Sequence, residues 1–495
     1  MFFRSRVPRV GALVSAAAMI LSIGASAHAG TIKVSKSGPV TSIQAAIDLA
    51  GPGDSILVKG GRYAGALVVP AGKSNLKLRG VGKVIVDARA PGGAAMGPAL
   101  TVLAENVLIR GFTLDHAQQI GDQHNGHGIE VHEPGLVVTR CTIRGSSDEA
   151  IRAFSANGLS ISRCTLTSNG GGILAVGEQI VVRSTTVSRA ATGGIVVFGQ
   201  NATLSRCKVI GSTSDGIVAF GSGSRIERCV VRNVEADGIR CEGSGLAILR
   251  NAVTNAAGHG IRVEGADARI DANAVARCGG DGIQVFGPFE RIAKNRVDAA
   301  LATVPDEGET PTLGDFDDAL TSTGRGIFVA QAQAGGLVTR NRVRETTSAG
   351  IELHASCFGV VVTANRIGDV GPRAGAHGLV LRGSDHEASK NSIQRCMFDG
   401  IHVDGDAMRI HANVVKASGR DGIDVESGAS SILTKNVVLG NAAEGIETNA
   451  NGTEVLGNLA KGNRIDFAAD GPLTVYDGNV TGDDTFANPR NPEID

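Results

Sequence analysis

The sequence predicts an all-β, right-handed, single-stranded parallel β-helix, a solenoid of coils of about 22 residues each. Three observations carry this prediction: glycines recur at a fixed interval, each is followed by alternating apolar and variable residues, and asparagines recur at a second fixed point. The glycines are Gly128, Gly172, Gly194, Gly216, Gly238, Gly260 and Gly282, with Ala150 in the missing place, and then Gly326, Gly350, Gly378, Gly400, Gly422 and Gly445.

Period-two alternation predicts a strand after each glycine, as in the segment from Gly238 to Glu242. A second strand ends near an asparagine in successive coils, at Asn251, Asn273, Asn295, Asn341, Asn365, Asn391 and Asn413. Aligned asparagine side chains hydrogen-bond up and down a stack. Leucine-rich and helical repeats of similar length lack this strand-turn-strand pattern, which leaves the β-helix.

The N-terminus predicts a signal peptide over residues 1–29. Arg4, Arg6 and Arg9 precede an apolar run over residues 10–23, and Ala27-His28-Ala29 forms a small-residue cleavage site. The run is short for a membrane span, which favours a signal peptide over an anchor. We therefore expect a secreted or periplasmic protein with no membrane span after cleavage.

The remaining chain divides into three parts. Residues 30–75 are expected to form an N-terminal strand and a capping helix that leads into the β-helix; Thr41–Ala50 has apolar residues at helical spacing after Ser and Thr. Residues 76–466 carry the repeats, with an insertion near 296–325, which either walls a binding face or is a tolerated disordered insertion. Residues 467–495 leave the repeat and form a cap or a tail.

Composition restricts the partners. The formal net charge of −1 gives no electrostatic footprint for nucleic acid, and aromatic residues are only 3% of the chain. Among the eight cysteines, Cys141, Cys164, Cys207 and Cys229 each follow an arginine at corresponding points of the repeat. They are interpreted as stacked turn residues; disulfides between neighbours such as Cys207 and Cys229 are the alternative. We expect a monomer.

The segment Ser42 to Val58, SIQAAIDLAGPGDSILV, followed by Gly60-Gly61-Arg62-Tyr63, resembles the start of many pectin-lyase-like β-helix proteins. The Gly-Ile repeats resemble the generic repeat of that superfamily across nearly the whole mature chain. The resemblance implies the fold, whereas lyases, hydrolases, epimerases, esterases and noncatalytic surface proteins share this scaffold.

Corresponding residues of successive coils line up on one face, so a site can be predicted from one position down the repeats. The residues before glycine give the candidate catalytic set Asp215, Asp237, His259 and Asp281. Outward strand positions give the candidate substrate-binding set Arg240, Arg262, Glu242, Glu264 and Gln284. Neighbouring carboxylates shift one another's pKa, which suits proton transfer, but Asp before Gly is also a good turn residue.

This row resembles the active site of polygalacturonases, whose catalytic residues also precede glycines. Gly258-His259-Gly260 matches one motif, and Asp215 and Asp237 fall at the earlier carboxylates. The sequence departs from that family elsewhere, because Ser214, Ala236, Gln284 and Phe286 stand where the family has Thr, Asp, Arg and Lys. These departures argue against hydrolysis by that mechanism.

Two further clusters contain metal-ligating residue types. Near the first coil, His124, His127 and His132 are candidate transition-metal ligands, with a solvated loop as the alternative. Near the end, an acidic patch suits Ca²⁺, with solvated charge as the alternative; it comprises His377, Asp399, His402, Asp404, Asp421, Asp424 and Glu426.

These features predict a secreted β-helix protein that binds or processes an acidic polysaccharide. Arg240 and Arg262 are expected to hold substrate carboxylates, while Asp237 and His259 are the proton-transfer candidates. The choice between lyase, hydrolase and epimerase stays open. The alternative is a noncatalytic envelope scaffold or adhesin, or a periplasmic accessory protein for a metal site, which the lack of Trp favours.

Overall fold

The computed structural model describes residues 29–89, 97–118, 125–300, 324–372, 375–469, 471–472, 474–482 and 486–487. The predicted signal peptide up to residue 28, His124 and residues 301–323 of the insertion lie outside this range.

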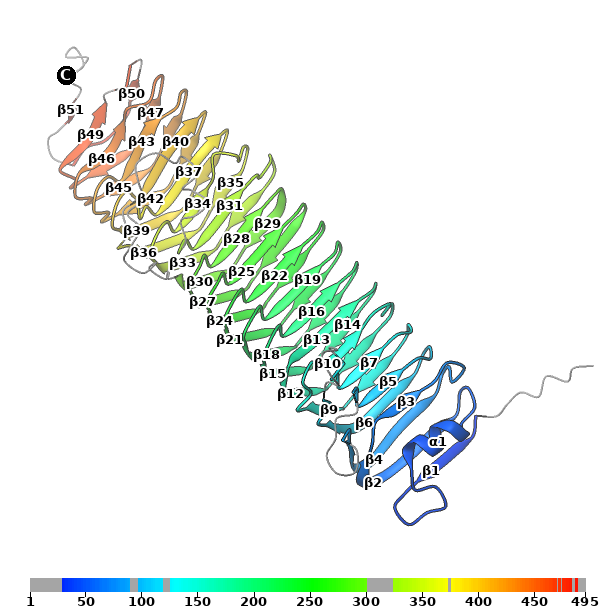
Figure 1. The fold of residues 1–495 in the computed structure, drawn as a ribbon. Helices are drawn as coiled ribbons and strands as arrows, with labels where there is room; N and C mark the ends of the chain where they lie inside the picture. Colours follow the sequence, from blue (N-terminus) through cyan, green and yellow to red (C-terminus); the bar gives the residue numbers. More distant parts are fainter. Residues whose placement is uncertain are drawn as a thin grey trace, which may run out of the picture.

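The described chain winds into a rod of stacked coils, each built from short parallel strands (Figure 1). One face, here called the candidate face, consists of β3 (Leu67–Val69), β5 (Leu100–Val102), β7 (Ile129–Val131), β10 (Glu149–Ala153), β13 (Gly171–Val176), β16 (Ile195–Phe198), β19 (Ile217–Phe220), β22 (Ile239–Glu242), β25 (Ile261–Glu264), β28 (Ile283–Phe286), β31 (Ile327–Ala330), β34 (Ile351–Leu353), β37 (Leu379–Ser384), β40 (Ile401–Asp406), β43 (Ile423–Ser427), β46 (Glu444–Thr448), β49 (Ile465–Ala469) and β51 (Phe486–Ala487).

The other strands belong to one 33-stranded sheet that bends within each coil. Its first limb contains β8 (Val137–Thr139), β11 (Ser160–Ser162), β14 (Val181–Arg183), β17 (Thr203–Ser205), β20 (Arg225–Glu227), β23 (Ala247–Leu249), β26 (Ala268–Asp271), β29 (Phe289–Ala293), β32 (Leu337–Thr339), β35 (Val361–Thr363), β38 (Glu387–Ser389), β41 (Arg409–His411), β44 (Ile432–Thr434), β47 (Glu454–Leu456) and β50 (Val475–Asp477). Its second limb contains β9 (Thr142–Arg144), β12 (Thr165–Asn169), β15 (Thr186–Ala190), β18 (Lys208–Ser212), β21 (Val230–Val234), β24 (Ala252–Ala256), β27 (Ala274–Cys278), β30 (Arg296–Ala300), β33 (Arg342–Thr346), β36 (Arg366–Val370), β39 (Ser392–Cys396), β42 (Val414–Lys416), β45 (Val437–Leu439) and β48 (Leu459–Lys461). At the N-terminal end the longer strands are β1 (Thr31–Val34), β2 (Ser55–Ala64), β4 (Lys77–Asp87) and β6 (Leu108–Asp115).

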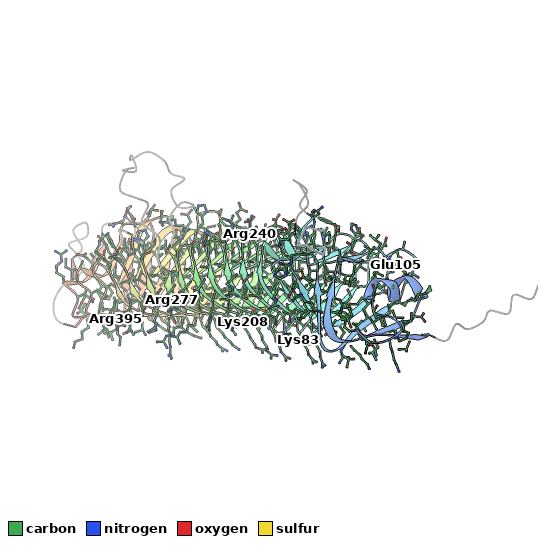
Figure 2. The ribbon with its side chains drawn as sticks, turned by 60° about the horizontal axis from the view of Figure 1, so that its bottom comes forward. Lys83, Glu105, Lys208, Arg240, Arg277 and Arg395 are labelled. Carbon is green, nitrogen blue, oxygen red and sulfur yellow. The ribbon has the colours of Figure 1, made fainter. Side chains whose placement is uncertain are left out.

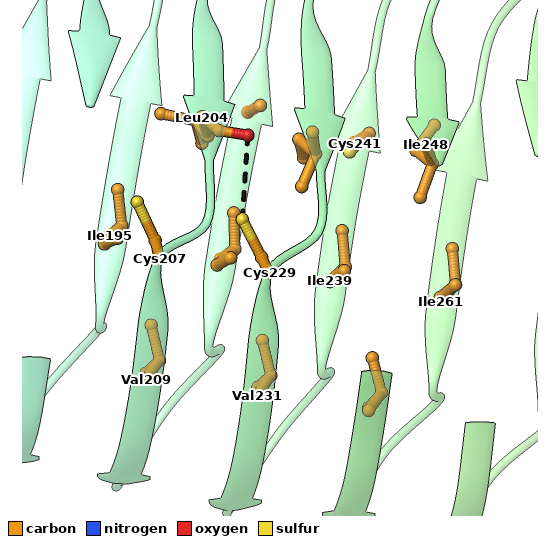
Figure 3. Close-up of a cluster of buried hydrophobic side chains, with 14 of the residues drawn as sticks. Ile195, Leu204, Cys207, Val209, Cys229, Val231, Ile239, Cys241, Ile248 and Ile261 are labelled. Carbon is orange, nitrogen blue, oxygen red and sulfur yellow. Dashed lines mark hydrogen bonds between the residues drawn. The ribbon is translucent and has the colours of Figure 1, made fainter. Parts of the chain in front are cut away.

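The predicted coil register is confirmed. Strand β19 pairs in parallel with β22, so that Ile217 lies beside Ile239, and β22 pairs with β25, so that Ile239 lies beside Ile261. These isoleucines are fully buried and stack along the core, as Figure 3 shows for Ile239 and Ile261. The period-two alternation therefore sends one side chain of each pair into the core and the next outward.

The repeated glycine is required by close packing between coils. A Cβ atom on Gly238 would lie 2.3 Å from Cγ1 of Val253 and 2.6 Å from the carbonyl oxygen of Gly260. These distances are too short for a side chain, so the glycine series marks the place where the coil turns against its neighbours.

The cysteines are stacked core residues. All eight are buried and unbridged, and Cys141, Cys164, Cys207 and Cys229 follow the bend residues of their coils, where the sequence places them. Figure 3 shows the Cys207 and Cys229 side chains in corresponding places of adjacent coils, and Sγ of Cys229 lies 3.6 Å from the carbonyl oxygen of Leu204.

The bend between the two limbs depends on residues in the left-handed region. Arg228 has φ 55° and Arg250 has φ 56°, and the next residue in each coil, Cys229 or Asn251, points inward. The backbone N–H of Asn251 donates to Oδ1 of Asn273 at 2.9 Å, and the Asn251 amide donates to the same oxygen at 3.1 Å. The same bonds link Asn273, Asn295, Asn341, Asn365, Asn391, Asn413, Asn436, Asn458 and Asn479, which confirms the predicted asparagine stack.

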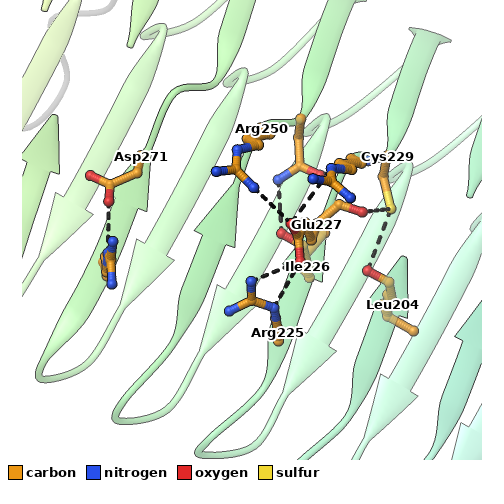
Figure 4. A network of polar contacts seen from close by, with 10 residues as sticks. Leu204, Arg225, Ile226, Glu227, Cys229, Arg250 and Asp271 are labelled. Carbon is orange, nitrogen blue, oxygen red and sulfur yellow. Dashed lines mark hydrogen bonds and ion pairs between the residues drawn. The ribbon is translucent and has the colours of Figure 1, made fainter. Parts of the chain in front are cut away.

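Outside the bend, charged side chains pair across coils. Glu227 accepts hydrogen bonds from Arg225 at 2.7 Å and from Arg250 at 3.2 Å (Figure 4). The Arg225 guanidinium holds the pKa of Glu227 below its usual value. Because these arginines are exposed, each pair contributes little to stability.

The predicted capping helix is present as α1 (Ile43–Leu49). The Ser42 side chain caps it by accepting the N–H of Ala45 at 3.3 Å, and Ile43, Ala46 and Ile47 are buried against the first strands. Within the described residues, no helix has the length and apolar character needed to cross a membrane.

Candidate functional site

The candidate face brings together the predicted substrate-binding residues. Arg240, Arg262 and Gln284 occupy one register position in β22, β25 and β28. Glu242 and Glu264 occupy a second position, two residues further along their strands. Figure 2 shows Arg240 toward one side of the rod and Lys208 toward the other. The predicted outward rows are thus adjacent in space, although Gln284 is buried rather than open to solvent.

The predicted catalytic residues form a ladder along the edge of this face. Asp215 Oδ1 accepts the backbone N–H of Asp237 at 2.8 Å, and Asp237 Oδ1 accepts that of His259 at 2.7 Å. His259 Nδ1 accepts the N–H of Asp281 at 3.0 Å. One acceptor atom of each side chain therefore binds a backbone N–H of the next coil. Asp237 Oδ2 and His259 Nε2 take no part in these bonds and are the candidate atoms for binding or proton transfer.

Asp281, the last of these four residues, is fully buried. Its carboxylate accepts hydrogen bonds from Arg325 Nε at 3.1 Å and Nη2 at 3.0 Å, and from the Gln284 amide at 3.2 Å. Arg325 is fully buried and its guanidinium lies 3.6 Å from the ring centroid of Phe328. Asp281 is therefore saturated by its neighbours, an arrangement that favours a positioning role over proton transfer.

Asp215 differs from Asp281 in being partly open. Burial raises the pKa of Asp215 above its usual value, and the neighbouring Asp237 carboxylate adds to the effect. Arg240 and Arg262 oppose the shift through their charge, which places them in electrostatic contact with the ladder.

Phenylalanine side chains flank the arginines, a feature that the sequence analysis did not identify. Phe198 and Phe220 pair edge to face at 5.4 Å between centroids. The Arg240 guanidinium lies 5.3 Å from the Phe220 centroid, and that of Arg262 lies 5.9 Å from Phe286. We call these five residues the Phe–Arg row. Phe198 and Phe220 occupy the outward position at the end of β16 and β19, so the period-two pattern contained the signal.

The predicted metal ligands of the first coil do not come together. His127 is fully buried, with Nε2 3.0 Å from Arg152 Nη1 and Nδ1 3.1 Å from a Glu149 oxygen. His132 instead pairs with Glu130 at 3.4 Å at the surface. The hydrogen bond from His127 lowers the pKa of Glu149. Within the described part of the chain, neither histidine belongs to a group of three potential metal ligands.

A denser group lies toward the C-terminal end of the same face, and we call His377, Asp399, His402, Asp421 and Asp424 the imidazole–carboxylate cluster. His377, Asp399 and Asp421 continue the ladder, whereas His402 and Asp424 are register neighbours in β40 and β43. His402 Nδ1 lies 3.2 Å from Asp424 Oδ2 and 3.5 Å from Asp399 Oδ2. His377 Nδ1 lies 3.0 Å from Asp399 Oδ2, and the two imidazoles stack at 4.4 Å.

Burial and charge oppose each other within the cluster. Burial disfavours protonation of His402, but hydrogen bonds to Asp399 and Asp424 outweigh it and raise the pKa of His402 to about 9. Burial also opposes ionisation of Asp399, yet His377 and His402 hold its pKa well below the usual range. For Asp421, burial and the nearby Glu444 carboxylate raise the pKa to about 8.

The predicted acidic patch is thus only partly a single group. Asp404 is exposed and lies 3.8 Å from Arg382, and Glu426 is exposed at the rim with one oxygen 3.3 Å from His402 Nε2. The other five predicted members, His377 and His402 included, are buried together.

Comparison with known families identifies the class of protein. The family model described as right handed beta helix region matches residues 104–227 and 193–377, which together span more than half of the chain. The chain belongs to this family, and its fold is the pectin-lyase-like right-handed β-helix that the sequence predicts. A second model, described as periplasmic copper-binding protein (NosD), matches residues 316–479, a stretch that contains the imidazole–carboxylate cluster.

No curated protein matches the chain. Among solved structures, the chain is similar to the Dettilon tailspike protein (15% identity, TM-score 0.35), of which it covers 57% with 63% of its own length. It is also similar to the periplasmic alginate epimerase AlgG (13%, TM-score 0.26, 87% of this chain and 77% of the other). The pectate lyase Pel9A gives 12% identity and a TM-score of 0.26, over 73% of this chain and 76% of the other. These similarities concern the fold.

Proposed function

We propose that the candidate face binds an acidic polysaccharide that lies along the rod, in a secreted or periplasmic protein. The observation that carries this proposal is the Phe–Arg row, in which the register neighbours Arg240 and Arg262 lie in the two coils between those of Phe220 and Phe286. Adjacent strands are about 4.8 Å apart, so an extended polymer along the axis meets the same row at each coil.

The chemistry of the row suits an anionic sugar. A guanidinium binds a carboxylate through two parallel hydrogen bonds, and an aromatic ring presents an apolar face to the C–H surface of a sugar ring. Arg262 is held by Glu264 at 2.8 Å, so its guanidinium is already oriented along the face before a ligand binds. Arg240 lies beside it in register and offers a second contact.

Proton transfer is the second part of the proposal. Asp237 Oδ2 and His259 Nε2 make none of the backbone hydrogen bonds of the ladder and are the candidate groups for this step. With Nδ1 accepting a backbone N–H, neutral His259 carries its proton on Nε2 and can donate a hydrogen bond there to a developing oxyanion, which leaves Asp237 Oδ2 as the proton-transfer group. A lyase, hydrolase or epimerase each needs such a group.

The test is calorimetric titration of the purified protein with a polyuronate, with a neutral glucan as the control ligand. Arg240→Ala and Arg262→Ala are each expected to weaken polyuronate binding about tenfold or more, because each removes a charge-assisted hydrogen bond. The matched control is Lys208→Ala, which removes an exposed cation from the other side of the rod. Equal binding of polyuronate and glucan, or an effect of Lys208→Ala as large as that of the arginine variants, rejects the proposal.

Turnover is measured in the same samples by following reducing ends and the absorbance of unsaturated uronate. Both signals together indicate a lyase, and reducing ends alone indicate a hydrolase. Binding with neither signal leaves an epimerase, which proton exchange at C5 detects, or a noncatalytic binding protein.

A second candidate function is an accessory role at a periplasmic metal site. It is favoured by the match to the copper-binding family model over residues 316–479 and by the location of the imidazole–carboxylate cluster within that stretch. Tight copper binding without polysaccharide affinity would support this function over the first.

A further inference from the structure

We propose that His377, Asp399, His402 and Asp424 form a binding site for a divalent first-row transition-metal ion. This inference concerns the imidazole–carboxylate cluster and is independent of polysaccharide binding at the Phe–Arg row, which occupies other coils of the same face.

The first argument is the convergence of ligand atoms. One ligand atom each from His377, Asp399 and His402 lies within 4.8 Å of the other two. Transition-metal ions bind imidazole nitrogen and carboxylate oxygen at about 2.0–2.2 Å, so atoms on opposite sides of one ion are about 4 Å apart. Small side-chain adjustments therefore suffice to bring these three groups onto one ion. Asp424, 3.2 Å from His402, lies close enough to add a further oxygen.

The second argument is an unsatisfied group aimed into the cluster. Asp424 is 3% exposed, and its Oδ1 atom has no hydrogen-bond partner among the described residues. Asp399 is fully buried, and its Oδ2 atom lies 3.0 Å from His377 Nδ1 and 3.5 Å from His402 Nδ1, between the two imidazoles. Buried carboxylate oxygens need a donor or a cation, and a metal ion between the carboxylates and imidazoles supplies one.

The third argument is a comparison within the same ladder. Asp281 occupies the position equivalent to Asp399, and there the buried Arg325 guanidinium satisfies the carboxylate. In the cluster no buried arginine among the described residues fills this place: the His377 and His402 imidazoles face Asp399 Oδ2, and Arg420 is half-exposed with its Nε atom 3.9 Å from Asp399 Oδ1. A metal ion would take the place that the guanidinium has in the central coils.

The ligand types select the ion. Two imidazoles with carboxylates are the preferred donors of Zn²⁺, Cu²⁺, Ni²⁺ and Fe²⁺, whereas Ca²⁺ takes six to eight oxygen ligands. The His377 and His402 side chains are 11% and 9% exposed, so an ion can reach them from the surface. The exposed Glu426 lies at the rim, where it attracts cations without being buried with them.

The experiment is a titration of the chelator-treated protein with Zn²⁺ against a competing indicator, followed by Co²⁺ binding monitored by visible absorption. We expect one Zn²⁺ per chain, and a loss of affinity of at least about tenfold in both His377→Gln and His402→Gln. The matched control is His411→Gln, because His411 lies in β41 of the other sheet and bonds to Thr434. Asp424→Asn, which keeps the side-chain shape, gives a second variant if a histidine substitution prevents folding; it is also expected to weaken Zn²⁺ binding.

The proposal fails if Zn²⁺ does not bind at micromolar concentration, if Ca²⁺ binds as tightly as Zn²⁺, or if the His377→Gln, His402→Gln and His411→Gln variants all behave like the wild type. Zn²⁺ binding without polyuronate binding supports this site and rejects only the function proposed for the Phe–Arg row. The reverse result rejects only the metal site.

Discussion

Two stretches of the same ladder neutralise their buried carboxylates in different ways. In the central coils Asp281 is bound by Arg325, which is fully buried and also lies 3.7 Å from Glu352. Toward the C-terminal end, Asp399 and Asp424 face His377 and His402 instead, and Asp424 Oδ1 has no partner among the described residues. The same backbone geometry thus supports a carboxylate that is fully bound by an arginine in the central coils. Toward the C-terminal end it supports carboxylates that are available to a ligand.

The difference shows that the backbone does not by itself decide which ladder position is functional. The coil supplies the same turn and the same N–H donor in both stretches. What differs is the group beside the carboxylate, which is a buried guanidinium at Asp281 and a pair of imidazoles at Asp399. Substitutions that remove or replace these groups test the comparison directly.

The largest effect is expected for Arg325→Met. It leaves the fully buried Asp281 carboxylate without its guanidinium, while Glu352 keeps its pair with Arg382, and should lower the free energy of unfolding by about 3–5 kcal/mol, measured by urea denaturation. The matched substitution Arg420→Met removes a half-exposed arginine from the C-terminal stretch and should cost less than about 1 kcal/mol. A similar loss of unfolding free energy in the two variants would contradict the view that an arginine neutralises the buried carboxylates only in the central coils.

Zn²⁺ should stabilise the wild-type protein by about 2.7 kcal/mol at a free concentration 100 times its Kd, because the ion binds the folded state. The same concentration should leave the stability of His402→Gln almost unchanged. Thermal melting with and without chelator measures both. An equal shift in the two proteins would place the ion elsewhere on the chain.

Replacing a single carboxylate in each stretch should also give different losses of stability. Asp281→Asn puts an amide donor against Arg325 and should cost about 1–3 kcal/mol, since a buried guanidinium loses its acceptor. Asp424→Asn, in the metal-free protein, should cost less, about 0.5–1.5 kcal/mol, because its amide oxygen can still accept from His402 Nδ1 and only the charge of this pair is lost. Urea denaturation in the presence of chelator gives both values.

The smallest effect concerns pH. Because burial raises the pKa of folded Asp215 above its unfolded value of about 3.9, its contribution to stability is complete below that pH and is lost as the pH rises through the folded pKa. Asp215→Asn keeps the acceptor for the Asp237 N–H and removes this dependence. The difference in unfolding free energy between wild type and variant should therefore change as the pH rises above about 3.9, whereas an unchanged difference would mean that Asp215 titrates alike in both states.

Much of the fold could be predicted because each coil repeats the same local constraints. The glycine spacing, the outward and inward alternation of Arg240 and Cys241, and the asparagine stack all follow from one period. The capping helix followed from Ser42 and the helical spacing of Ile43, Ala46 and Ile47.

The site was less predictable, because its geometry depends on contacts between coils. Arg325 binds Asp281 across 44 residues of sequence, most of them in the insertion, so the pair has no local signal. The hydrogen bonds that Asp237 and His259 accept from backbone N–H groups likewise depend on the position of the next coil. The Phe–Arg row has little signal in the sequence, because Phe198 and Phe220 stand in an outward register position but their contacts with arginines join different coils.

The asparagine stack has a consequence for how the molecule can change length. Each coil receives its acceptor from the following coil, through the same pair of bonds from Asn251 to Asn479. Adding or removing one whole coil therefore preserves every bond of the series and the direction in which each outward row faces. The distance between the Phe–Arg row and the imidazole–carboxylate cluster can accordingly change in steps of about 4.8 Å without rotating one relative to the other.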